Sequence, residues 1–237
     1  MYDNILFDKR IEVNEHICIN IPTVEEVLKN ENEYFGIIAL VTSTPSDLMV
    51  QLDDVGIDFT QISEWDLFVN LFDGLKDKDV SLVFGETKFS NFKKAINPKN
   101  GQLVLFDQET ETVIDREIYK KMCMAIRKIL CLKKPKKIKP ANKEAKEYLI
   151  ERARIKQNRA KSKPQKSQIE PFIIALVNSN EFPYNYETIK NITIYQFYAS
   201  LNQVVKRVQY DKTMIGCYAG TVDMKNLKPD ELSWIST

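Results

Sequence analysis

Residues 97–118 read NPKNGQLVLFDQETETVIDREI, and the periodicity of this stretch changes along its length. A turn at residues 97–101 precedes the apolar run 102–106, and a second turn at 107–111 precedes the apolar run 112–114. Short apolar runs bounded by Asn, Pro, Gly and Asp are typical of strands joined as hairpins. Asp115 follows directly and is a residue type that caps helices. The stretch therefore predicts a small antiparallel sheet that leads into a helix.

Helical spacing dominates on both sides of this stretch. Downstream, apolar residues recur every three or four positions as far as about Leu132, and residues 192–208 repeat this spacing near the C-terminus. Upstream, the run 81–84 is predicted to be a further strand of the sheet, whereas most other N-terminal segments have helical spacing. We therefore expect an α+β fold that is predominantly α-helical, with a small antiparallel β-sheet of hairpins in the N-terminal half.

A basic segment at residues 133–166 separates two acidic parts of the chain. Its net charge is +11, whereas the other residues sum to −10 and the whole chain to +1. Pro135 and Pro140 keep the first part of the segment out of a helix. The chain is thus predicted to have three parts: an N-terminal α+β module (1–132), a basic linker with an exposed helix (133–166) and a C-terminal helical module (167–237).

The residues that most enzymes and cofactor sites use are scarce. His16 is the single histidine, and the four cysteines form no C-x-x-C pair. The glycine-rich phosphate loops G-x-x-x-x-G-K-[ST] and G-x-G-x-x-G do not occur. We therefore expect a non-enzymatic protein with no metal and no cofactor. The cysteine usage favours reduced thiols in a cytoplasm, and no apolar run approaches the length of a membrane span.

Six aromatic side chains, most of them on predicted helices, are candidate contacts for a protein partner. The candidates are Trp65, Phe68, Phe72, Tyr195, Tyr198 and Trp234. Aromatic residues are common anchors at interfaces, and a groove between helices can accept an amphipathic helix. The same helix faces also form the cores of helical domains, so both interpretations remain open at this point.

The basic segment offers a second candidate contact, which is electrostatic. The candidates are Lys133, Lys134, Lys136, Lys137, Lys139, Arg152, Arg154 and Arg159. Such clusters bind nucleic-acid phosphates or an acidic partner, or they form a solvated hinge. Tyr148 is the one aromatic residue within 133–166, so the segment lacks a platform on which bases would stack. We therefore favour a protein partner over nucleic acid.

Several short motifs, taken in order, resemble one family of proteins. They are IPTVEEV (21–27), TPSDL (44–48), LDDVGIDF (52–59), WDLF (65–68), NGQLVL (100–105), VIDREIY (113–119), ITIYQF (192–197), GCYAGTVD (216–223) and LSW (232–234). The set is similar to a family of phage and prophage proteins of Gram-positive bacteria that includes tail assembly chaperones. The resemblance covers nearly the whole chain, from about Asp8 to Trp234.

The resemblance implies a role in tail morphogenesis in the cytoplasm of the bacterial host. Proteins of this kind bind the tape-measure protein, keep its apolar faces from aggregating and recruit tail-tube subunits. No catalytic residue is implied, and self-association is compatible with the role. Two alternatives remain open: a structural tail component of the virion, and a nucleic-acid-binding or host-directed regulatory phage protein.

Overall fold

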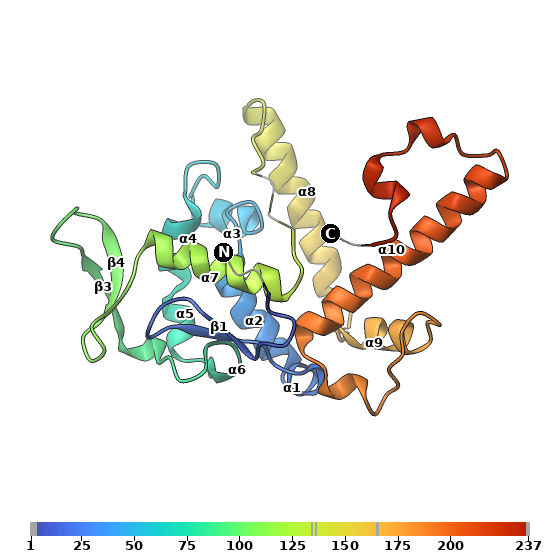
Figure 1. The fold of residues 1–237 in the computed structure, drawn as a ribbon. Helices are drawn as coiled ribbons and strands as arrows, with labels where there is room; N and C mark the ends of the chain where they lie inside the picture. The colour runs from blue at the N-terminus through green and yellow to red at the C-terminus, as the bar shows by residue number, and fades with distance from the viewer. Residues whose placement is uncertain (1–3, 134, 136, 165, 236–237) are drawn as a thin grey trace. The chain divides into compact units, whose positions relative to one another are not determined.

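The structure is a computed structural model that describes residues 4–133, 135, 137–164 and 166–235. Within these residues the chain forms ten α-helices and two small antiparallel sheets, and the sheets lie in the N-terminal half (Figure 1). The predicted α+β fold, predominantly α-helical with a small antiparallel sheet, is therefore confirmed.

The bounds of the elements follow the chain. The strands are β1 (Arg10–Glu12), β2 (Cys18–Asn20), β3 (Phe92–Ile96), β4 (Leu103–Asp107) and β5 (Thr112–Ile114). The helices are α1 (Val24–Lys29), α2 (Glu31–Thr42), α3 (Met49–Asp54), α4 (Glu64–Leu71), α5 (Asp73–Lys76), α6 (Ser81–Phe84), α7 (Arg116–Ile129), α8 (Lys143–Lys161), α9 (Glu170–Val177) and α10 (Ile194–Tyr218). Short 3-10 turns are η1 (Phe89–Asn91), η2 (Ile189–Asn191), η3 (Met224–Asn226) and η4 (Pro229–Leu232).

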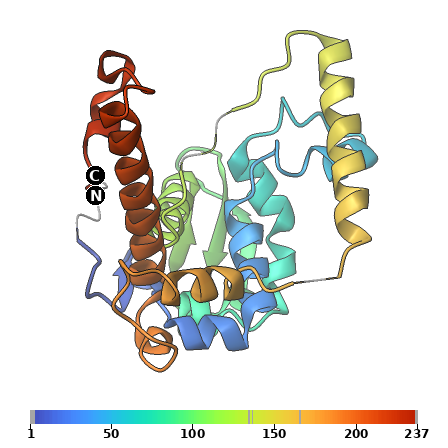
Figure 2. The same cartoon turned by 90° about the vertical axis from the view of Figure 1, so that its right-hand side faces the viewer.

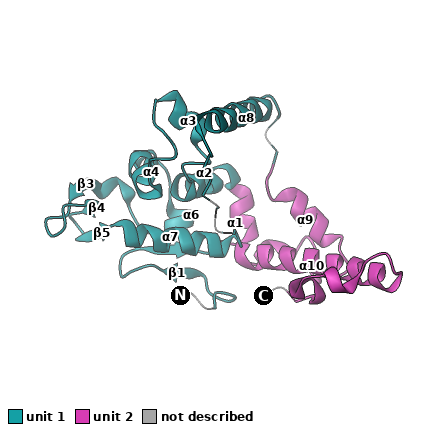
Figure 3. Ribbon diagram, turned by 90° about the horizontal axis from the view of Figure 1, so that it is seen from above, with its two compact units in different colours: residues 1–21, 30–166 teal, residues 22–29, 167–237 magenta. Residues whose placement is uncertain are grey.

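The chain divides into two compact units, which Figure 3 colours separately. Unit 1 comprises residues 1–21 and 30–166, and unit 2 comprises residues 22–29 and 167–237. Residues 133–166, the predicted linker and exposed helix, thus belong to unit 1. Residues 22–29 come from the N-terminal region of the sequence but belong to unit 2.

The three-stranded sheet of unit 1 has the order β3-β4-β5, with antiparallel pairing throughout. The strands predicted at 102–106 and 112–114 correspond to β4 and β5. The strand predicted at 81–84 is wrong, because these residues form the helix α6. Asp79 accepts a hydrogen bond from the Ser81 amide at 3.0 Å, and Gly85, with a φ of 59°, ends the helix. A four-residue apolar run fits a strand and a buried helical turn equally well.

The first strand of the sheet is instead β3, which the sequence pattern does not reveal. Of its five residues only Phe92 is buried, and Lys93 and Lys94 are exposed. Its sequence, FKKAI, does not alternate between apolar and polar residues, so the pattern does not predict a strand. Pairing with β4 holds β3 in place: Ile96 lies opposite Leu103, and the Asn97 amide donates to the Gln102 carbonyl oxygen at 2.8 Å.

Helix α7 follows β5 and begins where the sequence predicts. The Asp115 side chain accepts hydrogen bonds from the amides of Glu117 and Ile118, at 3.0 and 2.9 Å. These bonds satisfy two of the amides that a helix start leaves without a partner. The inner face of α7 is buried, including Met122 and Ile126, and α7 contacts α2 and β5. Asp115 thus fixes the start of a helix that packs against α2 and β5 within unit 1.

Unit 2 combines α1 with the C-terminal helices. The Val24 amide donates to the Ile192 carbonyl oxygen at 3.0 Å, and the Ile194 amide donates to the Pro22 carbonyl oxygen at 2.7 Å. Thr193 then starts α10 with a capping box that it shares with Gln196. The backbone of the 22–24 segment is therefore hydrogen-bonded to the segment that begins the longest helix of the unit.

Candidate partner-binding surface

Three of the predicted aromatic contacts lie in the core of unit 1. Trp65, Phe68 and Phe72 are buried, and the Phe68 ring stacks on Tyr119 of α7 with centroids 4.6 Å apart. The Phe72 ring in turn meets Phe89 edge to face at 5.6 Å. A partner cannot reach these side chains while the unit is folded, because they fill its interior. Their helical spacing reflects core packing.

The other three predicted aromatic contacts belong to unit 2. Tyr195 and Tyr198 are half-buried on the first turns of α10. Trp234 lies outside α10 and is 44% exposed. Its ring lies 4.8 Å from the guanidinium carbon of Arg207, which is a residue of α10. The structure therefore separates Trp234 from the two tyrosines by more than a helical turn.

The predicted electrostatic contacts in the connector are Lys133, Lys134, Lys136, Lys137 and Lys139. Lys134 and Lys136 lie outside the described residues, and the other three are exposed. Lys137 and Lys139 line a hollow of about 470 Å³ in unit 1, whose opposite wall comes from residues 44–46 and 59–64. The connector thus presents lysines beside a hollow that contains both apolar and polar groups.

An ion pair at this hollow attaches the first turns of α8 to the rest of unit 1. The Lys146 ammonium lies 2.9 Å from the Asp58 carboxylate, which also accepts a hydrogen bond from the Thr60 amide at 2.9 Å. The bond from Lys146, followed by those from Thr60, lowers the pKa of Asp58 to about 2. The Asp58 carboxylate therefore remains charged in the neutral pH range and is available to pair with Lys146.

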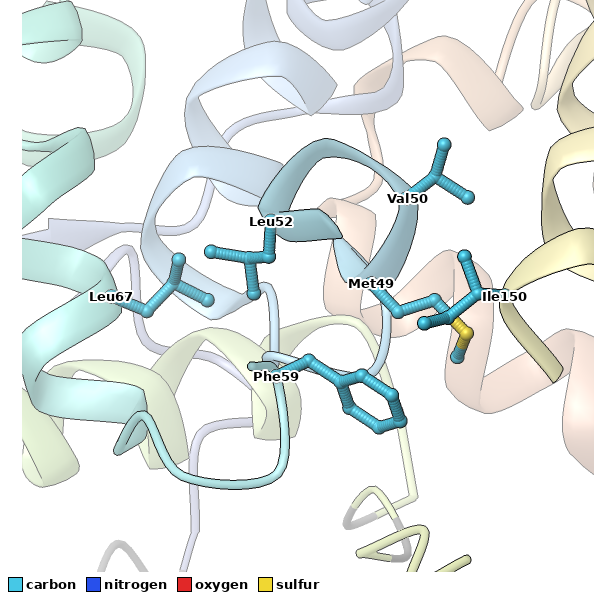
Figure 4. Close-up of a cluster of buried hydrophobic side chains, with 6 residues drawn as sticks. All are labelled: Met49, Val50, Leu52, Phe59, Leu67 and Ile150. Atoms are coloured by element: carbon cyan, nitrogen blue, oxygen red, sulfur yellow. The ribbon is translucent and has the colours of Figure 1, made fainter. Parts of the chain in front are cut away.

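Helix α8 packs against α3 through a small apolar cluster, shown in Figure 4. Ile150 points toward Met49 and Val50 of α3 in this view, and Leu149 and Ala153 pack against the same cluster. Figures 1 and 2 both show α8 (yellow) running beside α3. One face of α8 therefore packs against the rest of unit 1 through α3.

Arg154 contributes to the same attachment. Its guanidinium nitrogens lie 2.6 Å from the Asp54 carboxylate and 3.0 Å from the Asp53 carboxylate. Arg154 was predicted as a contact for a partner, and the structure shows it engaged within unit 1. The planar guanidinium suits this arrangement because it can donate to two carboxylates at once.

The opposite face of α8 carries Tyr148, Arg152, Ile155 and Arg159, and we call these four residues the α8 outer face. Their spacing of four, three and four positions puts them on one side of the helix. Tyr148 is 63% exposed and Ile155 is 46% exposed. A shallow, mainly apolar hollow along the helix is lined by these four residues together with Leu149, Glu151, Ala153, Lys156, Ala160 and Lys163. Two of the predicted contacts, Arg152 and Arg159, therefore lie beside two large exposed apolar side chains.

Sequence reasoning did not separate the two faces of α8. The sequence predicts one thin apolar face for this helix, made of Ala145, Tyr148, Leu149 and Ile155, and leaves out Ile150, the one residue of α8 that is buried within the described chain. The helical spacing of these residues could have separated the two faces. Lys146, Ile150 and Ala153 lie on one side of the helix, whereas Tyr148, Arg152 and Ile155 lie on the other. Which side is inside depends on α3, and the helix sequence carries no information about α3.

The part of the chain that the structure describes contains neither a metal-binding cluster of side chains nor a helix able to span a membrane. No cluster of three or more His, Cys, Asp and Glu side chains is placed to hold a metal ion among these residues. None of the described helices combines the length and the apolar character that crossing a membrane requires.

Comparison with known proteins finds a family match for the C-terminal part of the chain. Residues 161–237 match the family model of the YomV second domain, a match that begins at the last residue of α8 and includes α9, α10 and the C-terminal tail. No curated protein and no solved structure matches the chain. The match indicates a phage-derived protein, in agreement with the phage character of the family that the sequence motifs resemble.

Proposed function

We propose that this chain is a non-enzymatic phage tail morphogenesis protein that acts as a tail assembly chaperone. In this role it binds the tape-measure protein and promotes assembly of tail-tube subunits around it. The phage-derived character of residues 161–237 and the resemblance of the sequence motifs to tail proteins support the proposal. The observation that carries it is the α8 outer face.

The α8 outer face has the chemistry that an amphipathic, acidic helix requires. Tyr148 and Ile155 lie one above the other and can pack against apolar side chains of a second helix. Arg152 and Arg159 flank them and can pair with Asp or Glu on the margin of that helix. A tape-measure protein is a long helical chain whose apolar faces need cover before the tail tube forms. A segment of it with acidic margins would fit this face.

Substitutions that leave α8 attached to unit 1 test this proposal. Ile155→Glu and the pair Arg152→Glu/Arg159→Glu alter the outer face without touching Ile150 or Arg154. We expect each to weaken binding to the tape-measure protein by at least about tenfold, because each removes an apolar anchor or reverses the charge at the contact. Binding is measured by titration of the purified phage tape-measure protein, and circular dichroism checks that the variants fold.

The matched control carries the same charge change elsewhere. Lys9→Glu/Lys99→Glu also replaces two exposed basic residues of unit 1 and should leave binding unchanged. If the outer-face variants fold and bind as tightly as the unmodified chain, α8 is not the contact.

Nucleic acid is the second candidate ligand of the same face, because Arg152, Arg159 and Lys156 are exposed there. Salt-sensitive DNA or RNA binding that Arg152→Glu/Arg159→Glu abolishes would favour this alternative. Binding to the tape-measure protein without DNA or RNA binding at low salt would favour the chaperone.

A further inference from the structure

The C-terminal tail of unit 2 folds back on α10. Residues 219–235, which we call the strap, turn at the end of α10 and return along it, as the red segment of Figure 1 shows. Gly220, with a φ of 71°, makes the turn, since few residues other than glycine adopt this backbone conformation readily. The amides of Thr221 and Val222 both donate to the Gly216 carbonyl oxygen, at 2.9 and 3.1 Å.

Gly216 gives the strap the space that this return needs. A Cβ atom at position 216 would lie 2.8 Å from a methyl group of Val222, a distance so short for non-bonded carbon atoms that the Val222 side chain would have to shift. Glycine inside a helix lowers helix stability relative to alanine. Gly216 therefore disfavours α10 as a helix but allows Val222 to lie directly on its backbone.

Three side chains of α10 hold the far end of the strap, and we call Gln203, Lys206 and Arg207 the clasp. The Gln203 amide donates to the Trp234 carbonyl oxygen at 2.7 Å, and the Lys206 ammonium pairs with Asp230. The Arg207 guanidinium lies over the Trp234 ring. The clasp thus contacts a carboxylate and, four residues later, an aromatic ring and the carbonyl group of the same residue.

The strap makes these contacts without being buried. No residue of 219–235 is buried, and beyond Phe197 no residue of α10 is buried either, within the described chain. The Asp230 side chain is 77% exposed, whereas that of Lys206 is only 18% exposed. Segments held by exposed polar contacts with little apolar burial open at low cost in free energy. The strap can therefore leave α10 while the helix itself persists.

We propose that the clasp is a recognition site for a partner segment with an acidic residue followed four positions later by an aromatic residue, and that the strap occupies this site in the free protein. The strap then acts as an internal competitor, and Gly216 sets how firmly it is held. This site lies in unit 2 and is independent of the α8 outer face.

The first test releases the strap in the full chain. Gly216→Ala should push Val222 away and speed amide exchange in the strap and tryptic cleavage after Lys225 by about tenfold, while α10 keeps its helical signal because alanine favours helix. Gly216→Ala/Val222→Ala removes the clashing methyl group and should restore slow exchange. Equal exchange in Gly216→Ala and the unmodified chain would overturn the role of Gly216.

The second test examines recognition by the clasp. The probe is a labelled synthetic peptide of residues 223–235, which lacks Val222 and so avoids the substituted position. It should bind the Gly216→Ala chain about tenfold more tightly than the unmodified chain, because the apparent affinity scales with the fraction of open clasp. A control peptide with Asp230→Lys and Trp234→Ala should not bind. Equal binding of both peptides, or no binding of either, would overturn the proposal.

Discussion

Cys123 shows at the scale of a residue how burial determines chemistry. Its thiol lies inside unit 1, 3.4 Å from the Val41 carbonyl oxygen, and burial raises its pKa to about 11. A nucleophilic cysteine needs a lowered pKa and access to a substrate, and Cys123 has neither. Neighbouring Tyr119 is buried as well, and burial raises the pKa of its hydroxyl in the same way.

Stability should therefore fall at alkaline pH. In the unfolded chain the Cys123 thiol ionises near its ordinary pKa of 9, whereas in the folded chain it keeps its proton to about pH 11. The unfolded chain then binds fewer protons in this window, so the free energy of unfolding decreases as pH rises, by about 1.4 kcal/mol per pH unit at most. Urea unfolding at pH 8 and pH 10.5 measures the effect.

The control for this prediction is Cys123→Ala, which removes the titrating thiol. Its free energy of unfolding should change less between the two pH values, and the part that remains reflects Tyr119 and other groups. An unchanged pH dependence in Cys123→Ala would show that the thiol does not contribute.

At the scale of an element, α8 shows how one helix can combine attachment and exposure. Ile150 is 8% exposed and packs on α3, whereas Ile155 on the same helix is 46% exposed. Ile150→Ala should lower stability by about 2–4 kcal/mol, since it leaves a cavity in a small cluster, and should speed amide exchange throughout α8. Ile155→Ala should change the stability and the amide exchange of α8 by far less, because Ile155 is exposed.

This pair of substitutions is matched in residue type and helix, so differences in helix propensity cancel. Hydrogen exchange across residues 143–161 and urea unfolding provide the two measurements. Equal effects of the two substitutions would mean that the contact between α8 and α3 contributes little to holding the helix.

At the scale of the whole molecule, the proposed chaperone role predicts where the protein is found. A tail assembly chaperone acts before the particle is complete, so the chain should be abundant in lysates of infected cells and absent from purified virions. Quantitative mass spectrometry of both samples measures this distribution. A fixed copy number in virions would instead identify a structural tail component.

Local sequence signals predicted the elements whose ends and faces depend on nearby residues. Asp115 caps α7, and β4 and β5 lie where the turns around them indicated. The local signal failed at residues 81–84 and at β3. Residues 81–84 pack against β2, which is distant in the sequence, whereas β3 is held by pairing with β4 across the turn at 97–101.

The candidate surfaces could be predicted only in part. Arg152 and Arg159 were predicted as contacts and are exposed, whereas Trp65 and its aromatic neighbours, also predicted, are buried. The sequence did not predict the strap or its clasp. The reason for a glycine at position 216 becomes clear only from the structure, where Val222 packs against the backbone at that position. Helical spacing reveals that a helix has an apolar face but not what covers that face.

The sequence by itself determined the fold class, the two strands β4 and β5 that precede α7, the charge of the basic segment and the resemblance to phage proteins. These properties follow from composition, short-range periodicity and capping, which act between residues close in the chain. Only the tertiary structure decided which face of α8 is exposed, that residues 22–29 join the C-terminal unit, and that the strap lies on α10. Each of these depends on contacts between distant segments, which become favourable only when the chain has folded and buried apolar surface or paired backbone groups between them.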